Sequence, residues 1–270
     1  MSLDYSFPER LDAGVINDAS VSEESLDASL NPGEELFGEG EWPSLRGLWR
    51  VDHRTTLRSE LPVILQEVET VVDAVLIAEV TQEDELLWLH YRVCDVRMES
   101  DPAFNHTILP DAFLEGLPVR TRRASLERLT DGWTLDVPRQ YELRGVASDF
   151  PLDSPLPMTS ADPYIFDQDR DGAPGLTARL VGFPEGEVSL IQRSWDAWRG
   201  RLTLLRREIT EIKGSIEWGD EQRIIEASSD VFKVDVRRWI PEDASLHRFQ
   251  MRRIDQLVCP PRREPPTPDR

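Results

Sequence analysis

The most specific chemical spacing in the chain is the acidic run DQDRDGAPG, residues 167–175. In it, Asp167, Asp169 and Asp171 stand at alternate positions and Gly172 follows them. A hard cation takes roughly six to eight oxygen ligands, and this pattern matches the first, third, fifth and sixth positions of a calcium-binding loop. The backbone carbonyl of Ala173 would supply the next ligand. We therefore predict a calcium loop with ligands from Asp167, Asp169, Asp171 and Ala173.

The match to a calcium loop stops after Ala173. The twelfth position is Ala178 where an EF-hand has a bidentate Glu, and the flanking sequence indicates loop and strand instead of two helices. The loop is therefore not an EF-hand, and water, Asp162, Glu185 or Glu187 would complete the ligand set. The alternative is an Asp/Gly turn that binds no ion.

A two-residue alternation of apolar and polar positions dominates the chain between its two ends. From Trp133 to Leu143 the odd-numbered positions are mostly apolar and the even-numbered ones mostly polar, as in a half-buried antiparallel strand. The same alternation runs from Leu87 to Met98 but reverses its phase near Cys94. A reversal inside one strand predicts a β-bulge at that point.

Similar patterns predict about ten strands in all, separated by Gly, Pro and Asp turn signals such as Asp131-Gly132, Gly200 and Gly219-Asp220. One short helix is expected at Asp111–Leu117, opened by Pro110 and ended by Gly116 and Pro118. The fold class is therefore all-β, an antiparallel barrel or closed sandwich. The other expected strands are Leu48–Leu57, Val68–Val80, Arg120–Leu129, Leu176–Val181, Glu187–Trp195, Arg201–Leu205, Ile212–Trp218, Phe232–Val236 and Phe249–Ile254.

Composition divides the chain into three parts. Residues 1–41 hold eleven acids and a single base, Arg10, and few large apolar residues, which predicts a disordered or tethering segment. Residues 42–259 are expected to form a single β domain with a long internal loop at 149–175. Residues 260–270 are Pro-rich and should form an extended tail.

Charge and hydropathy exclude several partners. The net charge of −20 repels nucleic-acid phosphate, so we expect no nucleic-acid partner. No apolar run approaches the roughly 18 residues of a membrane helix, so we expect no transmembrane segment. The first residues have neither a basic nor an apolar stretch, so they do not resemble a signal peptide. Cys94 and Cys259 form a disulfide in an oxidising compartment or stay as two thiols, and the sequence leaves both open.

The acidic run also carries a resemblance. The segment DPYIFDQDRDGAPGLTARLVG, followed by GEVSLIQRSWDAWRG, resembles a motif of uncharacterised bacterial secreted proteins and lipoproteins. The matching residues are Asp167, Asp169, Asp171, Gly172, Pro174, Gly175, Thr177, Gln192 and Arg193. The resemblance covers about 40 residues well and implies export to the periplasm or the outside of the cell. It also implies a tethering role for the acidic segment, with a lipid anchor if a signal precedes this chain. Without such a signal the location is cytoplasmic.

A shorter resemblance lies at Gly47-Leu48-Trp49, which is similar to the G-x-W motif that opens the barrel of lipocalins. It implies an up-and-down barrel whose floor is plugged by Trp49. The alternative is an ordinary strand Trp.

Signatures of common enzymes are missing from the sequence, which has no G-x-S-x-G, no phosphate-binding Gly loop and no H-E-x-x-H. We therefore expect a non-enzymatic, exported or surface-tethered β domain with a structural calcium loop. The first alternative is a lipocalin-like carrier of a small apolar ligand, which a wide apolar cavity would favour. The second is a carboxylate-based hydrolase, which two convergent carboxylates in an open cleft would favour.

Overall fold

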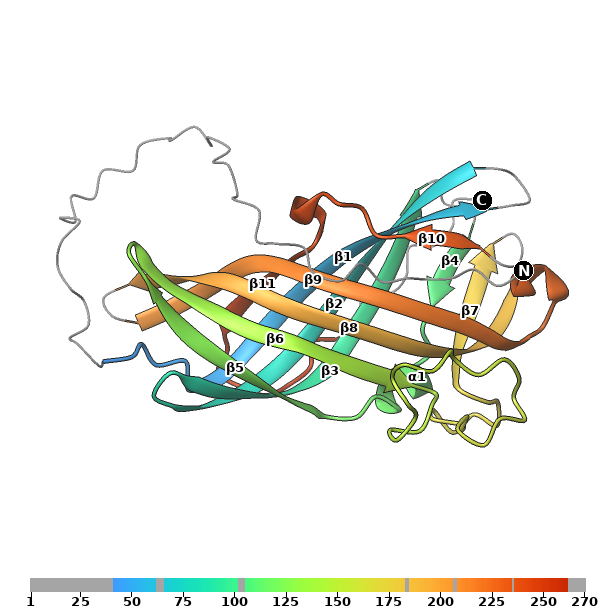
Figure 1. The fold of residues 1–270 in the computed structure, drawn as a ribbon, viewed down its shortest axis with the longest axis horizontal. Coiled ribbons are helices and arrows are strands. Elements are labelled where there is room, and N and C mark those ends of the chain that lie inside the picture. Colours follow the sequence, from blue (N-terminus) through green and yellow to red (C-terminus); the bar gives the residue numbers. More distant parts are fainter. Residues whose placement is uncertain are drawn as a thin grey trace. The chain divides into compact units, whose positions relative to one another are not determined.

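A computed structural model describes residues 41–61, 66–101, 105–182, 185–205, 208–234 and 236–261. These residues fold mainly into antiparallel β-strands (Figure 1). The strands are β1 (Gly47–Leu61), β2 (Gln66–Glu83), β3 (Leu86–Asp101), β4 (Asn105–Ile108), β5 (Arg120–Leu129), β6 (Gly132–Arg144), β7 (Leu176–Gly182), β8 (Gly186–Leu205), β9 (Glu208–Ala227), β10 (Arg237–Trp239) and β11 (Arg248–Arg253). The helix α1 (Asp111–Glu115) and the 3-10 turns η1 (Asp230–Lys233) and η2 (Ala244–Leu246) complete the described elements.

The sheet closes on itself. Its hydrogen-bonded order is β8-β6-β5-β3-β2-β1-β11-β9, and β9 pairs again with β8. The strands of this ring follow one another in chain order, with β4, β7 and β10 lying outside it. All ring pairs are antiparallel, so the ring has an up-and-down order.

The ring is complete along only part of its strands. β11 leaves β1 after pairing with Trp49–Arg54, and β10 takes its place beside Arg58–Glu60. On the other side, β6 pairs with β8 from Gln192 to Arg201, and β7 pairs with β8 from Gly186 to Leu190. The structure is therefore ring-like without being a regular barrel. We call the part with complete pairing the closed end and the part beside β4, β7 and β10 the cavity end, on the left and right of Figure 1.

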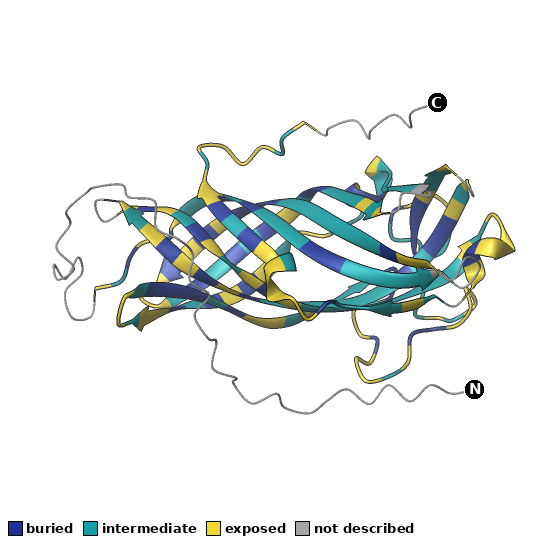
Figure 2. Ribbon diagram, turned by 90° about the horizontal axis from the view of Figure 1, so that it is seen from above, coloured by how far each residue is buried: buried dark blue, intermediate teal, exposed yellow. Residues whose placement is uncertain are grey.

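The closed end is filled by side chains. Buried and exposed positions alternate along the strands (Figure 2), and the inward set forms the largest hydrophobic core. Trp49 is fully buried in that core and donates its indole N–H to the carbonyl of Leu45 at 2.7 Å. The guanidinium of Arg253 lies 4.6 Å from the Trp49 ring centre and also donates to the carbonyls of Ser44 and Arg46. Trp49 therefore helps to close this end of the ring.

Several expectations from the sequence are confirmed. The all-β antiparallel class, the short helix after Pro110 and the hairpin at Asp131-Gly132 are present. The bulge is also present: the register of β2 against β3 shifts between Val75 and Leu76, which leaves Cys94 without a partner position. The phase reversal therefore located a real irregularity.

Two predicted turns are wrong. Gly200 and Gly219-Asp220 were expected to end strands, but β8 and β9 run straight through them. At both glycines another side chain comes too close for a Cβ atom. A Cβ on Gly219 would lie 2.2 Å from the indole nitrogen of Trp195, and one on Gly200 would lie 2.6 Å from the Phe249 ring. These glycines make room for aromatic packing within a strand.

A third expectation is also wrong. The alternation at Phe232–Val236 was predicted to be a strand, but the chain forms η1 there, and the next strand, β10, begins at Arg237. Ser229 caps η1 by accepting the N–H of Val231, and the buried side chain of Phe232 packs against β7 and β8. A single buried aromatic in a turn mimics part of a strand pattern.

The expectations for residues 1–40 and 262–270 lie outside the described residues. The described part of the C-terminal segment passes over β3, where Cys259 forms a disulfide with Cys94. Arg92 reinforces this contact by donating to the carbonyl of Leu257. Of the two options left open by the sequence, the structure therefore has the disulfide.

We expect Cys259→Ser to lower the free energy of unfolding by about 2–4 kcal/mol, because the bond closes a long loop in the unfolded chain. Urea unfolding with and without reductant measures this. Reductant should destabilise the parent protein and leave the variant unchanged. Two freely titrating thiols in protein kept under oxidising conditions would contradict the assignment.

Candidate functional site

The cavity end encloses a cavity of about 810 Å³. Its lining comes from the ring strands β1, β2, β3, β6, β8 and β9, together with β4, β7, β10, α1 and η1. The wall formed by β2 and β3 is mainly apolar, with side chains that include Val72, Leu76, Val93, Val96 and Met98. The opposite wall, formed by β6, β8 and β9, carries charged and amide side chains. The cavity is therefore amphipathic.

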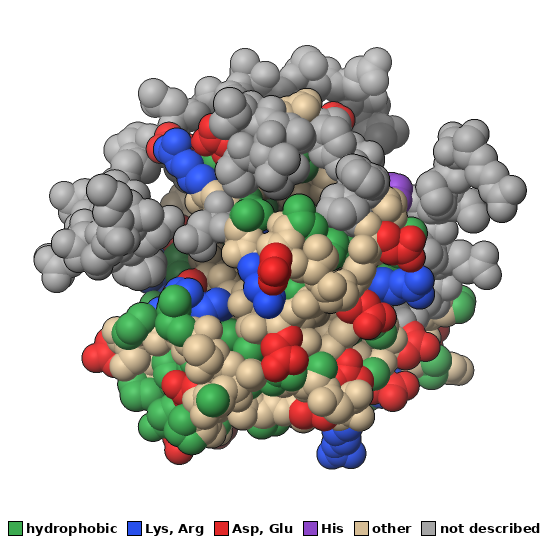
Figure 3. Space-filling model, turned by 90° about the vertical axis from the view of Figure 1, so that its right-hand side faces the viewer, with side chains coloured by type: hydrophobic (Ala, Val, Ile, Leu, Met, Phe, Trp, Pro, Cys, Tyr) green, Lys and Arg blue, Asp and Glu red, His purple; other side chains and the backbone are tan. Residues whose placement is uncertain are grey.

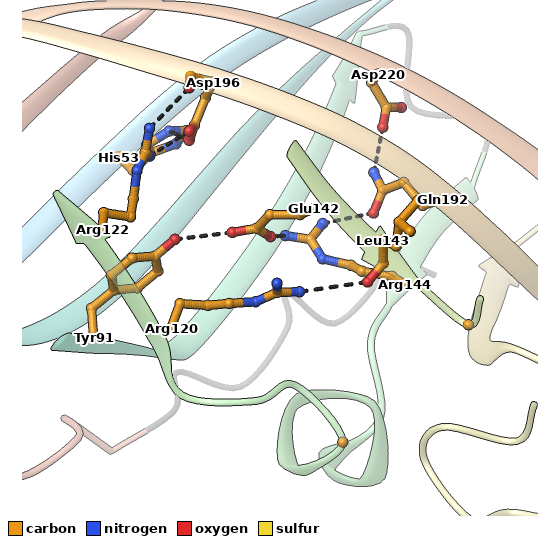
Figure 4. Close-up of polar contacts among 12 residues, drawn as sticks. His53, Tyr91, Arg120, Arg122, Glu142, Leu143, Arg144, Gln192, Asp196 and Asp220 are labelled. Carbon is orange, nitrogen blue, oxygen red and sulfur yellow. Dashed lines mark hydrogen bonds and ion pairs between the residues drawn. The ribbon is translucent and has the colours of Figure 1, made fainter. Parts of the chain in front are cut away.

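A buried ion pair separates the cavity from the packed closed end. Arg122 of β5 is only 2% exposed and pairs with the carboxylate of Asp196 on β8. The same guanidinium donates to the backbone carbonyls of Pro138 and Asp196, at 3.0 and 2.9 Å, and lies 4.8 Å from the ring centre of Trp198. Asp196 accepts the indole N–H of Trp198 and lies 3.6 Å from Nε2 of His53 (Figure 4). We call this group the floor layer.

Electrostatics keep the carboxyl group of Asp196 in the floor layer ionised. Burial alone would raise the pKa of Asp196, but the neighbouring His53 and the charge of Arg122 more than offset it. The pKa of this carboxyl therefore lies below its usual range. The pair stabilises the fold above the ordinary pKa of an Asp, and its contribution is lost as the pH falls through the lowered value.

On the cavity side of the floor layer, hydrogen bonds link polar side chains of the wall formed by β6, β8 and β9 to Tyr91 of β3 (Figure 4). Tyr91 donates its hydroxyl to Glu142 at 2.9 Å, and Arg144 donates to Glu142 at 2.7 Å and to the amide oxygen of Gln192 at 2.6 Å. The amide nitrogen of Gln192 then donates to Asp220. We call this chain the polar belt. It joins β3, β6, β8 and β9.

The two carboxyl groups of the polar belt have pKa values shifted in opposite directions. Burial opposes ionisation of Glu142, but the positive charges of Arg144 and Arg120 outweigh it, so the pKa of Glu142 is lowered. Burial dominates at Asp220 and raises its pKa despite the hydrogen bond from Gln192. A cavity that disfavours the charge of its own Asp220 also disfavours the charge of any other buried group without a partner.

The predicted metal loop lies outside this cavity. The carboxylates of Asp167, Asp169 and Asp171 offer ligand atoms that all lie within 4.8 Å of one another. Asp167 accepts the N–H groups of Asp171 and Gly172, and Asp171 accepts the N–H of Ala173. These bonds fold alternate side chains to one side of the loop, as the spacing predicted. The further proposal that the Ala173 carbonyl is a ligand stays a prediction.

Asp169 is the buried member of the cluster, with only 8% of its surface exposed. Its Oδ2 accepts the N–H of Thr177 at 2.9 Å, but its Oδ1 is buried without a hydrogen-bond partner. Burial raises the pKa of Asp169, as do the charges of Asp171 and Asp167. Leaving a buried carboxylate oxygen without a partner costs free energy, which a bound cation would relieve.

Of the other ligands considered for this loop, two have partners elsewhere. Glu185 forms an exposed ion pair with Arg179, and Asp162 accepts the N–H of Tyr164. Among the described residues, the carboxylates that come together in this loop are therefore those of Asp167, Asp169 and Asp171.

The loop is fastened to elements that line the cavity. Gln168 donates its amide to the carbonyl of Gly116, directly after α1, and accepts the N–H of Gly145. The bond from Thr177 to Asp169 holds the start of β7. Side chains of α1 and of β7, Phe113 and Ala178 among them, line the cavity. An ion in the loop would therefore stiffen two parts of the cavity wall.

Sequence reasoning identified the acidic loop but missed the floor layer and the polar belt. Their residues come from six strands, and apart from neighbours on one strand, such as Glu142 with Arg144 and Asp196 with Trp198, they lie far apart in the sequence. One signal was present: Arg122 alternates with Ala124 and Leu126, so it occupies an inward position of its strand. An arginine in such a position needs an internal partner.

The end view in Figure 3 shows acidic and basic side chains intermingled, with hydrophobic side chains gathered at the lower left. Large apolar side chains that are exposed near the cavity end include Met158 and Phe166 of the long loop, Val231 of η1 and Val234 directly after it. Val231 and Val234 also line the cavity. They therefore give its rim an apolar character.

Fold and cavity together define an antiparallel β ring with an internal amphipathic cavity. Comparison with known protein families, curated protein sequences and solved structures gave no match. Among the described residues, no helix is long and apolar enough to cross a membrane.

We expect Arg122→Met to lower the free energy of unfolding by about 3–5 kcal/mol at neutral pH, because it leaves the carboxylate of Asp196 buried without its partner. The penalty should shrink as the pH falls and Asp196 takes up a proton. Chemical unfolding at several pH values measures this. Arg123→Met, at the exposed neighbouring position, is the control and should have little effect. An equal loss at every pH would contradict the electrostatic explanation.

Proposed function

We propose that this protein is a non-enzymatic carrier that binds a small, largely apolar molecule in the cavity of its β ring. The observation that carries the proposal is the cavity itself, whose volume of about 810 Å³ lies within the range of small-molecule sites. A mainly apolar wall opposite a few placed polar groups is typical of such sites. This is the lipocalin-like alternative of the sequence analysis, which an internal apolar cavity favours.

The up-and-down order of the ring and the burial of Trp49 at the closed end support a lipocalin-like arrangement. The disulfide supports export to an oxidising compartment, the periplasm or the outside of the cell. The acidic segment 1–41 would then act as a tether. Carriage of an apolar ligand through water is a task suited to such a compartment.

The geometry of the cavity supports a carboxylate-based hydrolase less well than a carrier. Glu142 and Asp220 both face the cavity, and pKa values shifted apart are typical of acid–base pairs. However, both oxygens of Glu142 already accept hydrogen bonds, from Tyr91 and Arg144. Glu142 is therefore engaged as a structural ion pair instead of being presented to a substrate.

We expect the neutral fluorescent probe N-phenyl-1-naphthylamine to bind the protein with enhanced emission. The tryptophans Trp195, Trp198 and Trp218 line the cavity and should be quenched as the probe fills it. Val72→Trp, on the cavity wall, should weaken probe binding by about tenfold or more, because it occupies the space that the probe needs.

The matched control is Val71→Trp, at the adjacent strand position, which does not line the cavity and points to the other face of β2. It should bind the probe as the parent does. Loss of binding in both variants, or in neither, would count against the cavity as the binding site.

We also propose that the acidic loop is a structural calcium site, with Asp167, Asp169 and Asp171 as ligands and the carbonyl of Ala173 as a fourth. The observation that favours it is the buried Oδ1 of Asp169, which lacks a hydrogen-bond partner within the described structure. Without a bidentate Glu, the affinity should be weak and suited to the roughly millimolar calcium outside cells.

We expect about 5 mM calcium, within the extracellular range, to raise the melting temperature by roughly 5 °C over EDTA, because the ion binds only the folded loop. Differential scanning calorimetry measures the shift. Asp169→Asn should abolish it. The control Asp162→Asn, in the same long loop but outside the cluster, should retain it. Identical melting curves in calcium and EDTA would show that the loop is only a turn.

A further inference from the structure

The polar wall of the cavity pairs most of its charges internally. Glu142 is neutralised by Arg144, with a further hydrogen bond from Tyr91. In the floor layer, Asp196 is neutralised by Arg122. The charges that a ligand would meet on these groups are therefore already compensated.

The remaining charged groups are Asp220 and Arg238. Asp220 is held by the amide of Gln192, and Arg238 of β10 donates to the amide oxygen of Gln222 at 3.0 Å. The positive charge of Arg238 acts on Asp220 and opposes the rise in its pKa. These two groups therefore partly compensate each other and leave little net charge for a ligand to balance.

Hydrogen-bonding capacity nevertheless remains on this wall. Ser194 of β8 faces the cavity between Glu142 of β6 and Asp220 of β9, because it is paired in register with both residues. Asp220 accepts hydrogen bonds from Gln192 and Gln222 but, as a carboxylate with about four lone pairs, retains acceptor capacity. The hydroxyl of Ser194 and the remaining lone pairs of Asp220 can therefore serve a ligand group that donates or accepts a hydrogen bond.

We infer that the cavity selects an uncharged amphiphile: an apolar body lying against the β2 and β3 wall, and a hydroxyl or carbonyl group bound at Ser194 and Asp220. The inference rests on the proposed carrier function and adds the class of ligand to it. A carboxylate head group at this position would lie beside the like charges of Asp220 and Glu142. An ammonium would meet Asp220, but the charges of Arg238 and Arg144 already act on that carboxylate and would repel the ammonium. Either charge would be buried without a dedicated partner, which costs far more than burial of a hydroxyl that is hydrogen-bonded.

The test compares three molecules that share one chain and differ only in the head group: decanol, decanoate and decylammonium. Each is tested for displacement of N-phenyl-1-naphthylamine from the full-length protein at neutral pH, the charged analogues below their micelle concentrations and decanol below its solubility limit. We expect decanol to bind at least about tenfold more tightly than either charged analogue. Equal affinity for the three, or tighter binding of a charged one, would overturn the inference.

Two variants of the polar wall test whether Ser194 and Asp220 are the residues that bind the uncharged head group. The double variant Ser194→Ala with Asp220→Leu should weaken decanol about tenfold or more, because the decanol hydroxyl loses both of its partners. Binding of the probe, whose single N–H is only a weak hydrogen-bond donor, should stay within about twofold. Asp220→Asn alone keeps the shape and a hydrogen-bonding group, so it should retain the preference for decanol. An unchanged affinity for decanol in the double variant would refute the assigned residues.

Failure of the ligand class is distinguishable from failure of the carrier function. If the probe binds and is blocked by Val72→Trp but decanol does not displace it, the carrier proposal stands and the ligand class is wrong. If the probe itself does not bind the folded protein, both fall.

Discussion

The interior of this protein depends on one buried arginine. Arg122 points into the β ring, where its guanidinium pairs with Asp196, bonds two backbone carbonyls and lies over Trp198. A charge in that position is tolerable only with its partners in place, because removing it from water without them costs several kcal/mol. The requirement ties β5, β6 and β8 together at one level of the ring. Below that level the ring is packed with apolar side chains, and above it the cavity begins.

This layer explains why the two ends of one set of strands differ. At the closed end the strands pair all round, so inward side chains meet and fill the space. At the cavity end the pairing partners change to β7 and β10, and the inward side chains of the walls leave a cavity between them. The polar belt there is satisfied by hydrogen bonds among its own members, which leaves an amphipathic space without large uncompensated charge. This space is the basis of the proposal that the ligand is neutral and mostly apolar.

The acidic loop stands apart from the cavity but is not independent of it. Its Gln168 is bonded to the end of α1, and its Asp169 is bonded to the start of β7. Both elements contribute side chains to the cavity wall. Occupation of the proposed calcium site would therefore reduce the freedom of that wall, a stabilising influence on the cavity instead of a second function.

Local patterns of the sequence were enough to predict the strand class, the helix after Pro110, the bulge at Cys94 and the convergence of three aspartates. Each depends on neighbours within about a dozen residues, where backbone periodicity decides which side chains share a face. The sequence misled at Gly200 and Gly219, because a glycine in a turn and a glycine beneath an aromatic ring look the same in one dimension. Only the tertiary structure decided that Arg122 meets Asp196, that Glu142 and Asp220 share a cavity, and that Cys94 bonds Cys259. These partners lie far apart along the chain, and their meeting depends on ring closure, which no local pattern encodes.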